Sequence, residues 1–123
     1  MRGILIDPFT RSITEIETGG TLAEIYSTLE VELITVVSVG QDDALFLDDE
    51  GLFVPKEVQE YFYWRGSNQP YAGRGLILGA DEDGDNTDTS LTAEDVRRLV
   101  TFLDKKDVNP DEYNGVVIMA WGR

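Results

Sequence analysis

The stretch Gly73-Arg74-Gly75-Leu76-Ile77-Leu78-Gly79-Ala80 is an apolar run bounded by glycines, which is typical of a buried β-strand. The backbone groups of a buried strand must be paired, so we expect neighbouring strands on both of its sides. After it the chain is polar over residues 81–89, and Thr92-Ala93-Glu94-Asp95 then has the composition of a capped helix start. We expect the apolar stripe of this helix at Val96, Leu99, Val100 and Leu103.

The segments before this strand favour β-structure as well. Arg2–Asp7 and Ser12–Glu17 are rich in β-branched residues and flank a turn at Pro8, which predicts a hairpin. Thr21 and Glu24 have the spacing of a capping box at a helix start. The apolar positions of that helix are Leu22, Ile25, Tyr26 and Leu29.

The middle of the chain adds further strands. Leu33–Val39 is an uninterrupted apolar, β-branched run, which predicts a central strand. Ala44–Asp48 and Leu52–Val54 flank a turn-forming Asp-Glu-Gly sequence, which predicts a second hairpin. Residues 55–71 fit either a helix or a strand, and we favour a short helix leading into a strand. The run Val116–Trp121 predicts a final strand.

Taken together, these segments predict one acidic α+β domain over residues 1–123. We expect a mixed or antiparallel sheet of about five to seven strands with two main helices, because strand signals outnumber helix signals. The length of 123 residues and the hydrophobic content of 41% agree with one domain.

The residue types that are missing exclude several classes of chemistry. Histidine and cysteine are both absent, so Ser-His-Asp and Cys-His catalysis, cysteine redox chemistry and Cys/His zinc sites are excluded. An apolar run long enough for a transmembrane helix is also lacking, and residues 1–10 do not resemble a signal peptide. We expect a cytoplasmic location in the host cell.

Acidic residues dominate the charge. The chain has 24 Asp and Glu against 10 Lys and Arg, which gives a net charge of −14. Direct binding to a nucleic acid backbone requires Lys and Arg, so neither nucleic acid nor an anionic membrane is an expected partner. The acids concentrate in two clusters, and the second contains no Lys or Arg. The first contains Asp42, Asp43, Asp48, Asp49 and Glu50; the second contains Asp81, Glu82, Asp83, Asp85 and Asp88.

Three interpretations of these clusters compete. Acidic loops keep a protein soluble, also in a habitat of high salt. A calcium loop would place Asp81, Asp83 and Asp85 at its first, third and fifth positions, but Asn86 and Thr92 stand where Gly and Glu are needed. We therefore assign no metal. Alternatively, dense carboxylates could imitate the phosphates of duplex DNA and bind a protein that normally binds nucleic acid.

Catalytic patterns are weak. Asp104-Lys105-Lys106 offers carboxylate and ammonium groups, yet it is typical of a polar helix end. The glycines of residues 73–79 lack a phosphate-binding fingerprint. We expect no enzyme, no catalytic residues and no cofactor.

An aromatic segment over residues 61–71 gives an alternative site. Aromatic rings beside amide and guanidinium groups can bind a nucleotide-like small ligand, although core packing explains such rings equally well. The candidate ligand-binding residues are Tyr63, Arg65, Asn68 and Tyr71.

Three motifs of the chain carry a resemblance. Gln69–Gly79, the acidic loop with Asp83-Gly84-Asp85, and Ser90–Val96 together resemble a family of small phage, prophage and plasmid proteins that is catalogued as a domain of unknown function. The start, Ile4–Pro8 followed by Ile13–Ile16, is similar to that family too. The resemblance implies a mobile-element setting and supplies no catalytic residues. It favours an accessory protein that binds a host protein through the acidic clusters, for example a nucleic-acid-binding enzyme of host defence.

Overall fold

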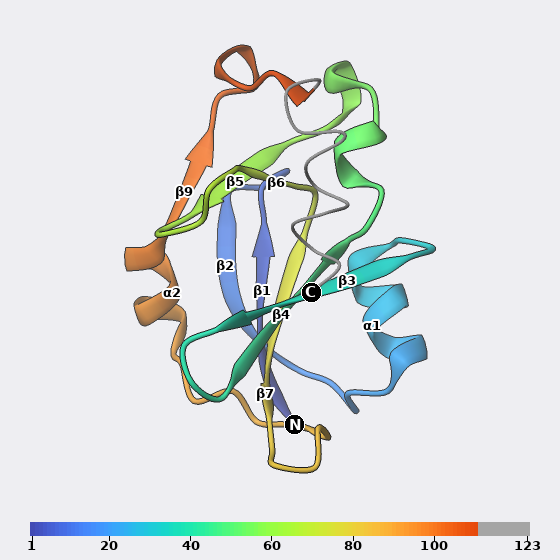
Figure 1. Ribbon diagram of the computed structural model, residues 1–123, viewed down its shortest axis with the longest axis vertical. Helices are drawn as coiled ribbons and strands as arrows, with labels where there is room; N and C mark the ends of the chain where they lie inside the picture. Colours follow the sequence, from blue (N-terminus) through green and yellow to red (C-terminus); the bar gives the residue numbers. More distant parts are fainter. Residues whose placement is uncertain (111–123) are drawn as a thin grey trace.

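A six-stranded antiparallel sheet forms the centre of the computed structural model, which describes residues 1–110 (Figure 1). The strand order is β2-β1-β7-β4-β3, and β8 extends the sheet beside β7. The strands are β1 (Arg2–Asp7), β2 (Ser12–Glu17), β3 (Ile34–Val39), β4 (Asp43–Asp48), β7 (Gly75–Ala80) and β8 (Asn86–Thr87).

A second, three-stranded antiparallel sheet has the order β6-β5-β9. Its strands are β5 (Tyr61–Trp64), β6 (Tyr71–Ala72) and β9 (Val100–Leu103). The helices of the described residues are α1 (Leu22–Leu29) and α2 (Ala93–Leu99), with short 3₁₀ turns η1 (Gly51–Phe53), η2 (Lys56–Val58) and η3 (Lys105–Asp107).

Both faces of the large sheet contribute buried side chains to the core. Successive residues of a strand point to opposite faces of the sheet. Leu45 of β4 packs in the cluster that includes Phe62 of β5 and Val96 of α2. Phe46, the next residue, belongs to the cluster on the other face with Ile25 of α1. The fold therefore has three layers, with α1 on one face of the sheet and α2 with the small sheet on the other (Figure 1).

The centre of the sheet is β7, as the glycine-bounded run predicted. Leu76, Ile77 and Leu78 are fully buried. At Gly79 the returning chain comes so close that an added Cβ would lie 2.2 Å from the carbonyl oxygen of Asp88. Glycine is therefore required where β8 and the segment after it pass β7.

The predicted fold class is confirmed, since the described residues form an α+β fold with two helices and an antiparallel sheet. The hairpin of β1 and β2 is confirmed, and so is the sequence of a short helical turn at η2 before β5. None of the helices within residues 1–110 is long and apolar enough to cross a membrane.

Both predicted helix starts are present. Thr92 accepts a hydrogen bond from the Asp95 N–H, and the Asp95 carboxylate accepts one from the Thr92 N–H, which lowers the pKa of Asp95. Thr21 accepts from the Glu24 N–H. The Glu24 carboxylate, however, accepts from the Gly19 N–H at 2.7 Å, and this bond lowers the pKa of Glu24.

The predicted length of the second helix is wrong. It ends at Leu99, and Val100–Leu103 forms β9 without an intervening loop. The reason is tertiary: β9 pairs with the aromatic strand β5, for example Phe102 with Phe62. β-branched and aromatic residues favour such pairing over continuation of a helix.

Two strand predictions also fail. Within residues 1–110, Ile34–Val39 is an edge strand rather than a central one, because the short turn to β4 places β4 between it and β7. Leu52–Val54 does not complete a hairpin, since the chain enters the 3₁₀ turn η1, in which Phe53 N–H donates to Glu50 O. The loop predicted over 81–89 contains β8. The strand predicted at Val116–Trp121 lies outside the described residues.

Candidate functional site

The structure groups the acidic residues differently from the two clusters that the sequence shows. Asp42 of the first cluster lines one hollow of about 460 Å³ together with Asp81 and Glu82 of the second. Asp83 and Asp85 follow in the same turn, and Asp88 comes directly after β8. We name these six carboxylates the acidic end: Asp42, Asp81, Glu82, Asp83, Asp85 and Asp88.

Strand pairing brings these segments together. Asp43, the first residue of β4, lies opposite Gly79 near the end of β7. The turn before β4 and the turn after β7 are therefore neighbours, and the Ala80 N–H donates to the Asp42 carbonyl at 2.8 Å. The acidic end thus follows directly from the register between β4 and β7.

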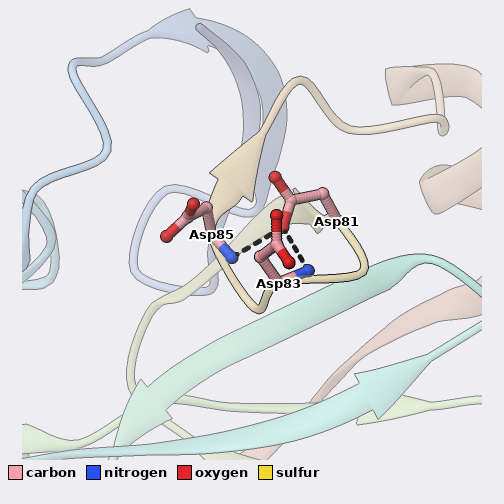
Figure 2. Close-up of side chains that lie close together, drawn as sticks. All are labelled: Asp81, Asp83 and Asp85. Carbon is pink, nitrogen blue, oxygen red and sulfur yellow. Dashed lines mark hydrogen bonds between the residues drawn. The ribbon is translucent and has the colours of Figure 1, made fainter.

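The turn between β7 and β8 holds three carboxylates close together. One oxygen of Asp81 accepts hydrogen bonds from the N–H groups of Asp83 and Asp85, both at 2.9 Å (Figure 2). Gly84 has φ +83°, a conformation that glycine adopts without strain. Carboxylate oxygens of the three Asp lie within 4.8 Å of one another and are exposed to solvent. The turn therefore concentrates negative charge in a short span.

Asp43 differs from these groups because it is buried. Its carboxylate accepts hydrogen bonds from the Thr89 hydroxyl at 2.6 Å, the Ser90 N–H at 3.0 Å and the Ser90 hydroxyl. Three donors satisfy a carboxylate that has lost water, so this residue joins β4 to the segment before α2. The sequence predicts Asp43 as a partner-binding candidate, and the structure shows its carboxylate buried and bonded to Thr89 and Ser90, in a residue that lines the same hollow as Asp42.

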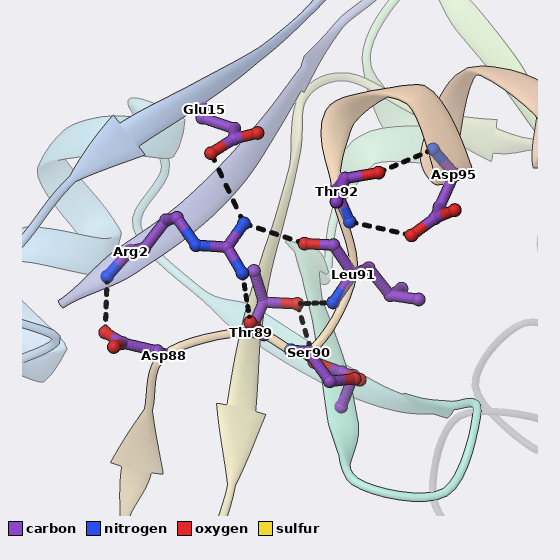
Figure 3. A network of polar contacts seen from close by, with 9 residues as sticks. Arg2, Glu15, Asp88, Thr89, Ser90, Leu91, Thr92 and Asp95 are labelled. Carbon is purple, nitrogen blue, oxygen red and sulfur yellow. Dashed lines mark hydrogen bonds and ion pairs between the residues drawn. The ribbon is translucent and has the colours of Figure 1, made fainter.

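Arg2 of β1 also binds the segment before α2 that Asp43 holds (Figure 3). Its guanidinium donates to the carbonyls of Thr89 at 2.6 Å and Leu91 at 2.8 Å, and it pairs with Glu15 at 3.3 Å. Its backbone N–H donates to the Asp88 carboxylate at 2.7 Å. Asp88 therefore has a structural contact although it is exposed.

The acidic end lacks compensating cations. Within residues 1–110, none of its six carboxylates forms an ion pair with a Lys or Arg side chain. Its hollow is lined by Ser, Gln and Ala besides the acids. Like charges without counter-charges create a negative potential that extends into the solvent.

The remaining acids of the first cluster lie at the opposite end of β4. Asp48 is half-buried, and burial raises its pKa, with Asp49 and Glu50 adding to the effect and the Glu50 N–H opposing it. Asp49 and Glu50 are exposed. This end also contains Arg74, which pairs with Asp7 at 3.4 Å and Glu30 at 3.2 Å and covers the ring of Phe9. This end therefore contains both signs of charge.

The four aromatic-segment candidates do not share one environment. Tyr71 is buried, and burial raises its pKa. Its ring lies edge-on to that of Phe62, with 5.7 Å between the ring centroids. The Tyr63 hydroxyl donates to the Ser67 carbonyl at 3.1 Å. Arg65 and Asn68 are exposed. The rings therefore serve packing and a local turn, and the polar side chains project into solvent.

Sequence reasoning missed the polar network around Asp43. Its members Arg2, Thr89 and Ser90 come from segments that are far apart in the sequence. The only local signal is an Asp at a strand start and a Thr-Ser pair ahead of a helix cap, and such residues are common in loops.

Comparison with known proteins gives a family. A family model described as "Domain of unknown function (DUF3846)" matches residues 1–104. The chain belongs to this family. The acidic end, both helices and β9 all lie within the part that matches DUF3846.

One relative of this DUF3846 chain is the uncharacterized protein y4iR of Sinorhizobium fredii (strain NBRC 101917 / NGR234). It is 30% identical over 93 residues, which cover 74% of this chain and 56% of y4iR. The chain thus spans little more than half the length of that relative. No solved structure matches the chain.

Proposed function

We propose that this DUF3846 protein is a non-enzymatic accessory protein of a phage or other mobile element, and that it binds a basic surface of a host protein in place of nucleic acid. The observation that carries the proposal is the acidic end, where carboxylates from both sequence clusters meet without a paired cation among residues 1–110. The partner class is a host enzyme that binds DNA or RNA.

The charge density of the acidic end supports mimicry. Duplex DNA carries one negative charge per roughly 1.7 Å of its axis. Carboxylate oxygens of the three Asp of the β7–β8 turn lie within 4.8 Å of one another, so this turn, like a phosphate backbone, concentrates negative charge. Such a surface attracts a basic groove over a distance and accelerates association at low salt.

The rigid base of the turn supports the same function. The Asp81 carboxylate accepts two backbone hydrogen bonds, and the Ala80 N–H ties the turn to Asp42. Carboxylates held in place lose less conformational freedom when they bind. The mobile-element setting rests on the resemblance of Gln69–Gly79 and Ser90–Val96 to small phage, prophage and plasmid proteins.

The test is capture of partners from host lysate at low and high salt. The triple variant Glu82→Gln, Asp83→Asn, Asp85→Asn removes three charges from the acidic end. The control Asp49→Asn, Glu50→Gln, Glu57→Gln removes three exposed charges from the other end of the molecule. We expect capture of a nucleic-acid-binding enzyme by the wild type and the control, and loss of capture for the first variant or at high salt.

A competition experiment tests whether this protein occupies the nucleic-acid site of the captured enzyme. A short DNA or RNA duplex should displace the chain from the captured enzyme, because both would occupy the same groove. Equal capture by both triple variants, or a complex that duplex does not displace, would contradict the proposal.

A further inference from the structure

A groove between the two sheets is lined by positively charged rather than negatively charged side chains. It is a hollow of about 420 Å³ between β2 of the large sheet and β9 of the small sheet. The residues that line it include Arg11, Ile13, Thr14, Arg97, Val100 and Phe102. Two arginines and no carboxylate line it.

Both walls of the groove are strand edges. Among the described elements, β2 pairs with β1 alone and β9 pairs with β5 alone. Arg97 donates to the Ile13 carbonyl at 2.9 Å, so this carbonyl faces outward from β2. In an antiparallel ladder every second residue points its peptide groups to the same side, so those of Glu15 face outward too.

The same alternation applies to β9. The Arg65 N–H donates to the Leu99 carbonyl at 2.8 Å, next to the pair Trp64 and Val100. The peptide groups of Phe102 therefore point away from β5 and toward the free edge. Unpaired strand edges are templates for an added strand.

The charge of the groove is uncompensated. Arg11 donates to the Leu103 carbonyl at 3.4 Å and Arg97 to Ile13, and neither forms an ion pair with any residue of the described part. This is notable in a chain with 24 acidic residues. Guanidinium groups that donate only to carbonyls keep their positive charge and their remaining N–H donors for a carboxylate.

We infer that this groove binds an acidic segment of a partner protein as an added β-strand. Main-chain groups of the strand edges would pair with the segment, and its carboxylates would contact Arg11 and Arg97. The apolar side chains of Val100 and Phe102 would contact its other face. The free strand edges favour a peptide over a small anion, because only a peptide has main-chain groups in register with them.

The inference does not depend on the proposed function. The acidic end binds positive charge, whereas the groove binds negative charge. Because the net charge is −14, nonspecific attraction would favour a basic peptide over an acidic one. Preference for an acidic peptide therefore reports on the groove alone.

The test uses a fluorescent peptide of alternating Glu and Val, with a Lys and Val peptide for comparison, and fluorescence anisotropy as the measurement. Arg11→Gln and the double variant Arg11→Gln, Arg97→Gln should weaken binding of the Glu peptide, the double variant by about tenfold or more. The matched control is Arg98→Gln, since Arg98 lies on the same helix, is exposed and pairs with Glu94. Arg11→Gln alone preserves the bond from Arg97 to Ile13.

Backbone methylation separates strand addition from charge pairing. N-methyl groups on either alternate set of peptide residues should weaken binding, because one set would donate to the edge of β2 and the other to the edge of β9. The inference is overturned if either methylated peptide binds as tightly as the unmethylated one, if the Lys peptide binds as well to the groove as the Glu peptide, or if inorganic phosphate displaces the peptide. A peptide-free dimer that dissociates in the Arg11→Gln variant, measured by light scattering, would assign the groove to a second copy and overturn it too.

Discussion

Two kinds of carboxylate lie at the same end of the large sheet. Asp43 is buried and accepts three hydrogen bonds from Thr89 and Ser90, whereas Asp81, Asp83 and Asp85 are exposed in the turn opposite it. Their formal charges are the same in the sequence. The difference teaches that hydrogen-bond donors from distant segments, rather than the density of acids, decide which carboxylate holds the fold and which stays exposed to solvent.

The largest expected effect is a loss of stability on replacing Asp43, the buried carboxylate of this comparison. Asp43→Ala would leave the two hydroxyls and the N–H of Thr89 and Ser90 without their acceptor. We expect a loss of about 3 kcal/mol in the free energy of unfolding, measured by urea denaturation. The neighbouring exposed residue gives the control, because Asp42→Ala should change this free energy little. Equal losses in the two variants would contradict the distinction.

The second effect concerns the helix that the buried carboxylate anchors. Thr92→Ala removes the cap that accepts the Asp95 N–H at 3.1 Å. We expect a loss of about 1 kcal/mol in the free energy of unfolding. Thr92→Ser should retain most of this stability, because the serine hydroxyl can accept the same hydrogen bond. If Thr92→Ser loses as much as Thr92→Ala, the cap is not the cause.

Asp48 is an intermediate case, since it is half-buried and has a raised pKa. The ionised form is disfavoured in the folded state, so Asp48→Asn should stabilise the protein at pH 7 by less than about 1 kcal/mol. Asn can still accept the Glu50 N–H. The advantage should shrink as pH falls through the raised folded pKa and vanish below the unfolded value of about 4. Urea denaturation across this pH range measures it; an advantage that grows toward low pH would contradict the assignment.

The smallest expected effect tests the exposed member. Glu82→Gln, Asp83→Asn and Asp85→Asn together should leave stability unchanged or raise it by a few tenths of a kcal/mol at low salt. The reason is relief of repulsion between like charges, and the gain should disappear in high salt. Thermal unfolding at two salt concentrations measures it. A clear loss of stability would show that this turn holds the fold in the way that Asp43 does.

The fold could be predicted to the extent that local patterns determine it. The apolar run at Gly75–Ala80 and the cap at Thr92 are local, and both are present as expected. The end of α2 at Leu99 depends on pairing of β9 with β5, which lies more than thirty residues earlier in the chain. A periodicity of apolar residues does not contain that information, because Val100 and Leu103 suit either a helix or a strand.

The candidate site shows the same limit. Sequence identified the acidic loop, because its residues are adjacent. It could not show that Asp42 and Asp48 lie far apart, since Asp42 directly precedes β4 and Asp48 is the last residue of that strand. Nor could it place Arg11 beside Arg97, which approach each other only through the packing of β2 against α2 and β9.

Among the described strands β3 pairs with β4 alone, and this free edge has a consequence for handling the protein. Its sequence, Ile-Thr-Val-Val-Ser-Val, contains no charge and no proline, and Val36 is 45% exposed. Such strands are prone to intermolecular stacking and amyloid-like aggregation. Mutual repulsion of highly charged molecules opposes this, and it weakens near the isoelectric point of about 4.1. The acids thus also act as a colloidal stabiliser, and acidification should precipitate the folded protein through this edge before it unfolds.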